Sequence, residues 1–164
     1  TLEHTFAVGN GHVTSMAVYR GLAYATVTAD TGVQARCFQR SDAGVWTSVD
    51  ASGVNATIGY DWYDGLVVYE DALYAARFLR DTNAFVIRKF DGTTWTTAYN
   101  IEANFASRST VGQPLVYKSK LYVPIPEPNN GGASAGLILQ NASGTWAKAT
   151  DYEGRGFLAA VLIG

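Results

Sequence analysis

VYRGLAYA at Val18–Ala25 returns as VYEDALYA at Val68–Ala75 and again as VYKSKLYV at Val116–Val123. The three copies begin 50 and 48 residues apart, so their spacing is nearly constant. Each copy pairs a valine with a tyrosine, continues through two polar or glycine residues, and leads into a second short apolar run. This is the pattern of a tight β-hairpin, in which a two-residue turn joins two strands. The sequence therefore contains an internal repeat built on a hairpin.

A second landmark keeps the same period. A glycine-containing turn and a tryptophan follow each hairpin, and the tryptophans are Trp46, Trp95 and Trp146. Their spacings are 49 and 51 residues. Two landmarks with one period indicate a repeated structural unit, and a period of about 40–50 residues with four short strands is typical of a β-propeller blade. We therefore predict an all-β fold made of propeller blades.

Four strands are expected in each unit. The first ends at the Val-Tyr pair and covers Val13–Tyr19, Tyr63–Tyr69 or Val111–Tyr117. The second follows the turn, the third lies beyond a loop, and the fourth begins at the tryptophan. Apolar residues occupy both faces of the first strand, as in GLVVY and QPLVY, which predicts burial on both sides. The tryptophans are expected to pack between adjacent blades. No segment has a sustained helical period, so we expect almost no helix.

The repeats predict one domain over residues 1–164. The blades cover about 13–50, 63–100 and 111–150, and partial strands are expected at 2–8 and 157–163. The total is about three and a half four-stranded blades, whereas closed propellers have about four to eight. Two explanations remain open. Copies of the chain complete a ring by self-association, or the arc is completed by missing sequence, the remainder of a larger propeller.

Composition excludes several classes of partner. Of the 164 residues, 48% are hydrophobic and only 16% are charged, and 17 glycines suit many short strands joined by tight turns. The net charge is −2 without a basic block, so no nucleic acid partner is predicted. No apolar run reaches the length of a membrane span, which argues against membrane insertion. The lone Cys37 is expected to be buried. These features favour an extracellular or virion-surface location without identifying one.

The chain resembles known propeller families in two places. The turns before the tryptophans, SDAGVW, FDGTTW and NASGTW, are similar to a degenerate Asp-box, Ser-x-Asp-x-Gly-x-x-Trp, of sialidase-like propellers. The order Val-Tyr, turn, Leu-Tyr resembles kelch-like blades. In these families the Asp-box is a folding element at an outer turn, so the resemblance implies a fold and not an activity.

Residues for catalysis are sparse. His4 and His12 are the only histidines, and no His-x-Glu, Cys-x-x-Cys or Asp-rich loop accompanies them, so no metal and no cofactor is predicted. A sialidase-like site would need clustered arginines, a tyrosine nucleophile and paired acids. The candidate arginines, which we expect mostly on solvated faces of outer strands, are Arg36, Arg40, Arg77, Arg80 and Arg88. We therefore predict that the chain is not an enzyme.

An aromatic and acidic segment precedes the second blade and has no counterpart before the other two. Aromatic rings stack on sugar faces, and carboxylates accept hydrogen bonds from sugar hydroxyls. The predicted ligand-binding set is Tyr60, Asp61, Trp62, Tyr63, Asp64 and Arg77. The alternative is that Trp62 and Tyr63 pack between blades while the aspartates cap a turn.

A proline-rich segment in the third blade is the other departure from the repeat. Pro124–Gly132 contains three alternating prolines and ends in Asn-Asn-Gly-Gly. Alternating prolines favour a stiff extended chain, and the tip is typical of a turn. The segment is interpreted as a recognition loop, a contact between subunits or a tolerated insertion, and the sequence does not choose among them.

The functional prediction is a non-catalytic binding or assembly module. In this hypothesis the chain is a surface or virion-associated recognition propeller that binds a glycan or a protein through its loops. One alternative is a structural assembly or decoration protein without a small ligand. A second alternative is a fragment of a sialidase-like enzyme that processes glycans.

Overall fold

The computed structural model describes residues 12–28, 36–50, 62–79, 84–101, 112–125 and 137–151. These residues form three four-stranded antiparallel sheets, and none of them is helical. Within each sheet, strands that follow one another in the chain lie side by side. The prediction of an all-β chain with four strands in each repeat is confirmed.

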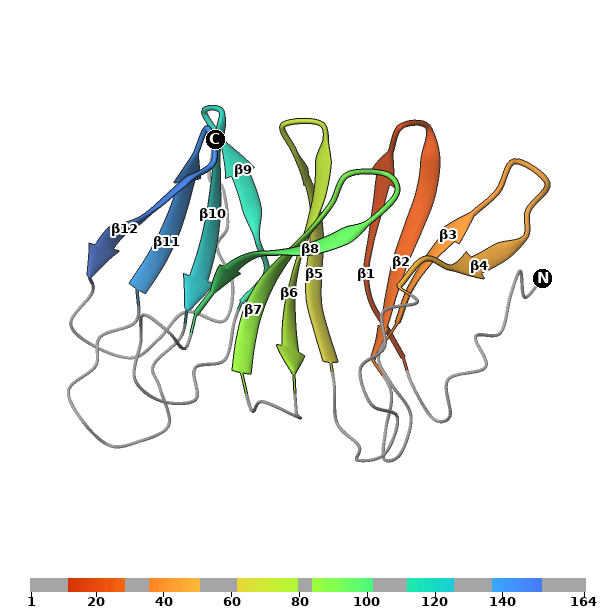
Figure 1. The fold of residues 1–164 in the computed structure, drawn as a ribbon, viewed down its shortest axis with the longest axis horizontal. Coiled ribbons are helices and arrows are strands. Elements are labelled where there is room, and N and C mark those ends of the chain that lie inside the picture. Colours follow the sequence, from red (N-terminus) through yellow and green to blue (C-terminus); the bar gives the residue numbers. More distant parts are fainter. Residues whose placement is uncertain are drawn as a thin grey trace.

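The sheets follow the repeats in order. The first sheet contains β1 (His12–Tyr19), β2 (Leu22–Thr28), β3 (Arg36–Arg40) and β4 (Trp46–Ser48). The second contains β5 (Trp62–Tyr69), β6 (Ala72–Leu79), β7 (Ala84–Phe90) and β8 (Trp95–Asn100). The third contains β9 (Leu115–Tyr117), β10 (Lys120–Ile125), β11 (Leu137–Ala142) and β12 (Thr145–Asp151). Figure 1 shows the three sheets side by side in chain order, with the first hairpin turn of each at the same end.

Two differences from the predicted strand limits occur at prolines. β9 begins at Leu115 and not at Val111, because Pro114 lacks the N–H group that a strand uses in its ladder. Pro124 was predicted to open a loop, but it lies in β10 opposite Ile138. Its carbonyl accepts a hydrogen bond from the Gly112 N–H at 2.8 Å. The remainder of the predicted loop, 126–132, lies outside the described residues.

The first turn of every sheet has the same geometry. The last residue of the first strand is opposite the first residue of the second strand, as Tyr19 is opposite Leu22, so two residues form the turn. Both turn residues have positive φ, as in the type I′ turn that matches the twist of a hairpin. Only Gly21 among them is a glycine. The left-handed residues with side chains are Arg20, Glu70, Asp71, Lys118 and Ser119.

The turns before the tryptophans are held by side-chain oxygens. Ser41 Oγ accepts a hydrogen bond from Val45 N–H at 3.1 Å. Asp91 Oδ1 accepts from Thr93 and Thr94 N–H, both at 2.8 Å. Asn141 Oδ1 accepts from Gly144 N–H at 3.0 Å. Three different residue types thus perform the same capping role at equivalent turns.

Residues in each sheet alternate between two faces, which we name by their repeat positions. The front face carries the tyrosine of the Val-Tyr pair, and the back face carries the valine and, on the fourth strand, the tryptophan. The front face of the first sheet packs on the back face of the second, and the front face of the second packs on the back face of the third. Each sheet therefore has the same orientation relative to the sheet that follows it.

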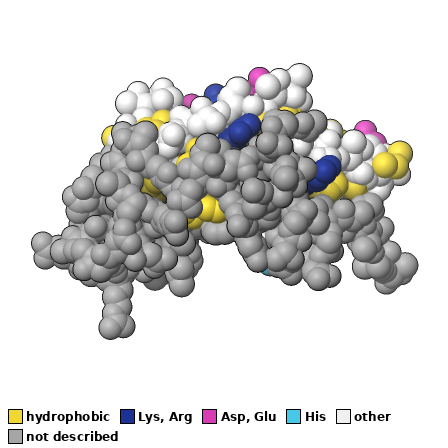
Figure 2. Space-filling view, turned by 60° about the horizontal axis from the view of Figure 1, so that its bottom comes forward, with side chains coloured by type: hydrophobic (Ala, Val, Ile, Leu, Met, Phe, Trp, Pro, Cys, Tyr) yellow, Lys and Arg dark blue, Asp and Glu magenta, His cyan; other side chains and the backbone are white. Residues whose placement is uncertain are grey.

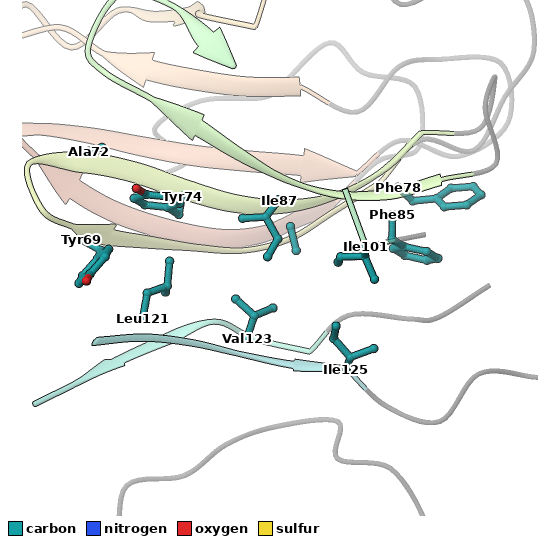
Figure 3. Packing of buried hydrophobic residues seen from close by; sticks show 11 residues of the cluster. Tyr69, Ala72, Tyr74, Phe78, Phe85, Ile87, Ile101, Leu121, Val123 and Ile125 are labelled. Atoms are coloured by element: carbon teal, nitrogen blue, oxygen red, sulfur yellow. The ribbon is translucent and has the colours of Figure 1, made fainter. Parts of the chain in front are cut away.

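Two apolar clusters fill the spaces between the sheets. In the first, Tyr19, Tyr24 and Cys37 of the first sheet pack against Leu73 and Trp95 of the second. In the second, Leu121, Val123 and Ile125 of β10 point toward Tyr74 and Ile87 of the second sheet (Figure 3). Burial of this apolar area is the main force that holds the sheets together.

The predicted role of the tryptophans is confirmed for two of them. Trp95 lies in the cluster between the first and second sheets. Trp146 packs against the cluster between the second and third sheets, with its ring centroid 5.3 Å from that of Tyr99. Trp46, on the back face of the first sheet, is half-buried.

The prediction that every first strand is buried on both sides is wrong. Met16 and Val18 of β1 lie on the back face of the first sheet and are 59% and 70% exposed. Tyr117 of β9 lies on the front face of the third sheet and is 42% exposed. Both faces are the ones without a neighbouring sheet among the described residues, which is the physical reason for the exposure.

Candidate functional site

The described members of the predicted ligand-binding set, Trp62, Tyr63, Asp64 and Arg77, lie toward one end of the sheets. The two-residue turns occupy the opposite end, so β2, β6 and β10 all run toward the end where β5 begins. Trp62, the first residue of β5, and Ile125, the last of β10, therefore mark the same end of the fold. The described parts of the two departures from the repeat, 62–64 and 124–125, both lie toward this end.

Three charged or polar side chains meet between the first and second sheets at this end. Arg77 Nη1 donates a hydrogen bond to Asp50 Oδ2 at 2.8 Å and a second to the Tyr63 hydroxyl at 3.2 Å. The Tyr63 hydroxyl also donates to Asp50 Oδ2. The Arg77 guanidinium carbon lies 5.0 Å from the centre of the Tyr63 ring. We call Asp50, Tyr63 and Arg77 the buried triad.

Strand register and the end of β4 together explain this arrangement. Tyr63 and Arg77 are opposite residues in the pairing of β5 with β6, and both lie on the back face of the second sheet. Asp50 follows β4 and reaches them from the first sheet. At the equivalent positions of the first sheet the pair is Val13 and Val27, so the polar pair belongs to the second repeat alone.

The triad is isolated from solvent. Tyr63 is 0% and Arg77 is 2% exposed, and the Asp50 side chain is 1% exposed. A buried carboxylate beside a buried guanidinium keeps both charges compensated in a medium of low dielectric constant. Burial raises the pKa of Tyr63 well above its usual range, although Arg77 opposes the shift. The phenol therefore stays protonated at neutral pH, and its buried oxygen lacks the access to a substrate that a nucleophile needs.

A second buried arginine lies on the same back face. Arg88 is buried, and its Nη2 donates a hydrogen bond to the backbone carbonyl of Trp95 at 3.2 Å. The expectation that the arginines mostly lie on solvated faces is therefore wrong for Arg77 and Arg88. Both sit between sheets, where their long stems pack on apolar neighbours while their charged groups are hydrogen-bonded. Arg36 is exposed, as expected.

The predicted ligand-binding set divides into three parts. Tyr60 and Asp61 lie outside the described residues, and Trp62 and Asp64 belong to β5 with no description of their side chains. Tyr63 and Arg77 are brought together, but in the space between two sheets. For Tyr63, the structure agrees with the alternative interpretation of packing between blades.

Asp50 is the residue that sequence reasoning missed. It stands 27 positions before Arg77, and no local pattern connects the two. The only available signal was its place directly after a short tryptophan strand. The Asp50 carboxylate is tolerated in the buried space because Arg77 of the second sheet lies beside it and compensates its charge.

The described residues contain no group of three or more metal-ligating side chains that could hold a metal ion. No described segment forms a helix long and apolar enough to cross a membrane. Cys37 is a free, buried thiol, as expected, and burial raises its pKa. On the face shown in Figure 2, the visible basic side chains of the described residues are separated from one another.

Comparison with known proteins does not assign the chain to a family. The chain matches no protein-family model, and no curated protein matches it.

Proposed function

We propose that the chain is an arc of a β-propeller and acts as a non-catalytic binding module for a glycan. The binding surface lies at the end of the sheets where β5 begins. The observation that carries the proposal is that the described parts of both departures from the repeat, 62–64 and 124–125, lie toward this one end, while the first hairpin turns at the opposite end keep one length and backbone geometry. Binding residues are commonly held on variable segments by a rigid frame.

The inter-sheet contacts support this frame. The hydroxyl of Tyr19 donates to the Asp71 carbonyl at 2.7 Å, and that of Tyr69 donates toward the Ser119 carbonyl at 3.3 Å. Equivalent tyrosines thus hold equivalent turns of the following sheet, and this constant step from sheet to sheet is typical of propeller blades. The side-chain caps of the outer turns are a further similarity to Asp-box propellers.

The buried triad supports the frame at the binding end. It fixes the start of β5 against the first sheet through hydrogen bonds to Asp50, so the backbone positions of Trp62 and Asp64, on either side of Tyr63, are held rigidly. An aromatic ring and neighbouring carboxylates suit a sugar, whose apolar face stacks and whose hydroxyls donate hydrogen bonds. In this proposal Tyr63 and Arg77 position the ligand-binding residues and do not touch the ligand.

A glycan array with the purified chain tests the proposal. We expect binding to a restricted set of glycans, lost on Trp62→Ala and weakened on Asp61→Asn. Val45→Ala is the matched control, because it truncates an exposed apolar side chain in a turn at the opposite end and should leave binding unchanged. Thermal melts of all variants separate loss of the site from loss of the fold.

Three outcomes contradict the proposal. The first is an array without binding by the wild-type chain. The second is unchanged binding by Trp62→Ala and Asp61→Asn in folded protein. The third is hydrolysis of a fluorogenic glycoside by the wild-type chain, which would favour the enzyme hypothesis.

A further inference from the structure

The two sheets at the ends of the described arc expose complementary faces. At each interface within the chain, a front face with two tyrosines meets a back face with a tryptophan and aliphatic residues. Tyr19 and Tyr24 form the front pair of the first sheet, with ring centroids 5.9 Å apart, and Tyr69 and Tyr74 form that of the second at 5.8 Å. The third sheet repeats the pair as Tyr117 of β9 and Tyr122 of β10. In the pairing of these strands, Tyr117 is opposite Lys120 and Tyr122 is opposite Leu115.

Exposure distinguishes the outer faces from the covered ones. Tyr117 is 42% exposed, whereas Tyr19 and Tyr69 are 2% and 4% exposed. On the back face of the first sheet Met16 is 59% exposed, whereas its counterpart Leu66 in the second sheet is 5% exposed. Met16 and Tyr117 are thus presented to solvent, whereas their counterparts Leu66 and Tyr69 are buried at the inner interfaces.

We propose that the front face of the third sheet binds the back face of the first sheet of a second copy of this chain, and that two such contacts close a ring of two chains. The partner is a second copy because this chain itself carries the surface that the front face of the third sheet requires. The contact continues the two interfaces already formed within the chain, residue for residue. The proposal is independent of glycan binding, because it involves neither residues 60–64 nor the start of β5.

The repeat predicts the polar contact at the new interface. Tyr19 and Tyr69 donate to the carbonyl of the second turn residue of the following sheet, Asp71 or Ser119. The corresponding turn residue of the first sheet is Gly21. Tyr117 of one copy therefore donates to the Gly21 carbonyl of the other, while Met16 and Val18 cover the apolar part of the contact.

Whether the contact closes a ring depends on the rotation between successive sheets. A contact between two different surfaces forms a ring if the rotation closes and an open filament if it does not. Two copies contribute at least six four-stranded sheets, which lies within the range of about four to eight blades of closed propellers. A closed pair also removes both exposed apolar faces, which an open chain of copies leaves at its ends.

Native mass spectrometry and sedimentation equilibrium test this inference on the full chain. We expect a species of twice 17.6 kDa that does not grow further with concentration. Met16→Lys blocks the back face, because its counterpart Leu66 is buried at the inner interface, and Tyr117→Lys blocks the front face, so each variant alone is expected to be monomeric. Thr96→Lys is the control, because it places the same charge on an exposed position of the second sheet and should leave the pair intact.

Mixing the two blocked variants gives the decisive measurement. Met16→Lys retains an intact front face and Tyr117→Lys an intact back face, so an equimolar mixture forms one front-to-back contact and gives a complex of two chains. Both substitutions are at exposed positions, and circular dichroism verifies that each variant is folded. A wild-type chain that stays monomeric at high concentration, a species that grows beyond two chains, or a mixture of folded variants that remains monomeric overturns the proposal. Unchanged glycan binding by the monomeric variants would leave the proposed function standing by itself.

Discussion

The hydroxyl of Tyr19 donates a hydrogen bond to the backbone carbonyl of Asp71 at 2.7 Å, across the space between the first and second sheets. The tyrosine belongs to the last position of β1, and the carbonyl belongs to the two-residue turn between β5 and β6. The contact is reinforced by an ion pair between Arg20 and Asp71, with 2.6 Å between Nη2 and Oδ2. This ion pair is exposed, so the hydrogen bond of the buried tyrosine is the more important of the two.

Tyr19→Phe should lower the free energy of unfolding by about 1 kcal/mol, because it removes one hydrogen bond and keeps the ring in place. Urea denaturation in the Met16→Lys background, which is expected to be monomeric, measures the change. Tyr117→Phe is the matched control, since the same substitution at an exposed repeat position should be nearly neutral. Equal losses for the two variants would show that the inter-sheet hydrogen bond contributes nothing specific.

The buried triad predicts strong coupling between Asp50 and Arg77. Arg77→Ile leaves the Asp50 carboxylate buried without the cation at 2.8 Å, and Asp50→Asn leaves the guanidinium without its counter-charge. Each single variant should lose about 3–5 kcal/mol, the typical result of breaking a buried ion pair from one side. Isoleucine is a fitting replacement because Ile125 occupies the equivalent place in the third sheet.

The double variant Arg77→Ile with Asp50→Asn should be less destabilised than the sum of the two single variants. It removes both charges and keeps an acceptor for the Tyr63 hydroxyl. A complete double-mutant cycle by urea denaturation measures the coupling. Additive losses would indicate that the two charges do not stabilise each other in the folded chain.

The sheets could be predicted from the sequence because their determinants are local. The copies at Val18–Ala25 and Val68–Ala75 carry turn residues and strand residues within eight positions, and β-hairpins depend mainly on such short-range patterns. The packing of Trp95 between sheets could also be predicted, because a large ring at a fixed repeat position is buried wherever a neighbouring sheet covers it.

The burial of Arg77 could not be predicted in this way. Arginine in a second strand has the same local pattern whether it faces solvent or a neighbouring sheet, and the deciding group, Asp50, comes from another repeat. The exposure of Met16 and Val18 was missed for a related reason. Apolar residues on both faces of a strand indicate two covered faces only if a sheet is present on each side.

The first turn of the third sheet should accept stabilising substitutions. Lys118 and Ser119 have φ values of 47° and 58°, a region that costs a residue with a side chain about 1–2 kcal/mol relative to its ordinary conformation. Asn-Gly is the preferred sequence for this turn type. Lys118→Asn combined with Ser119→Gly should therefore raise the free energy of unfolding by about 1 kcal/mol.

Gly21→Ala provides the opposite change at the equivalent turn of the first sheet. Its φ is 80°, and an added Cβ meets no atom within 4 Å, so any loss comes from the backbone conformation and not from a clash. A loss of about 1 kcal/mol is expected. Thermal melts compare the melting temperatures of both variants with that of the wild-type chain. A lower melting temperature for the Asn-Gly variant would contradict the assignment of strain to this turn.

Acid should weaken the second sheet through Asp91. Its carboxylate accepts hydrogen bonds from Thr94 and Thr93 N–H, and these bonds lower the pKa of Asp91 below its usual value of 3.8. Because the folded pKa is the lower one, the stabilisation is present above the unfolded pKa and is lost as the pH falls through the folded pKa. The melting temperature should therefore fall as the solution is acidified below about pH 4, and part of this fall should disappear in Asp91→Asn.

Asparagine at position 91 should still cap the turn at neutral pH, since Asn141 performs that role in the third sheet. Ser41→Ala tests the electrostatic part separately. The Ser41 hydroxyl caps the equivalent turn of the first sheet and does not ionise in this range, so its removal should lower the melting temperature equally at neutral and acid pH. Melts of the three proteins across the acid range measure these differences. If Asp91→Asn retained the full acid sensitivity of the wild-type chain, another carboxylate would have to be responsible, and Asp71, whose pKa the Arg20 hydrogen bond also lowers, would be the next residue to change.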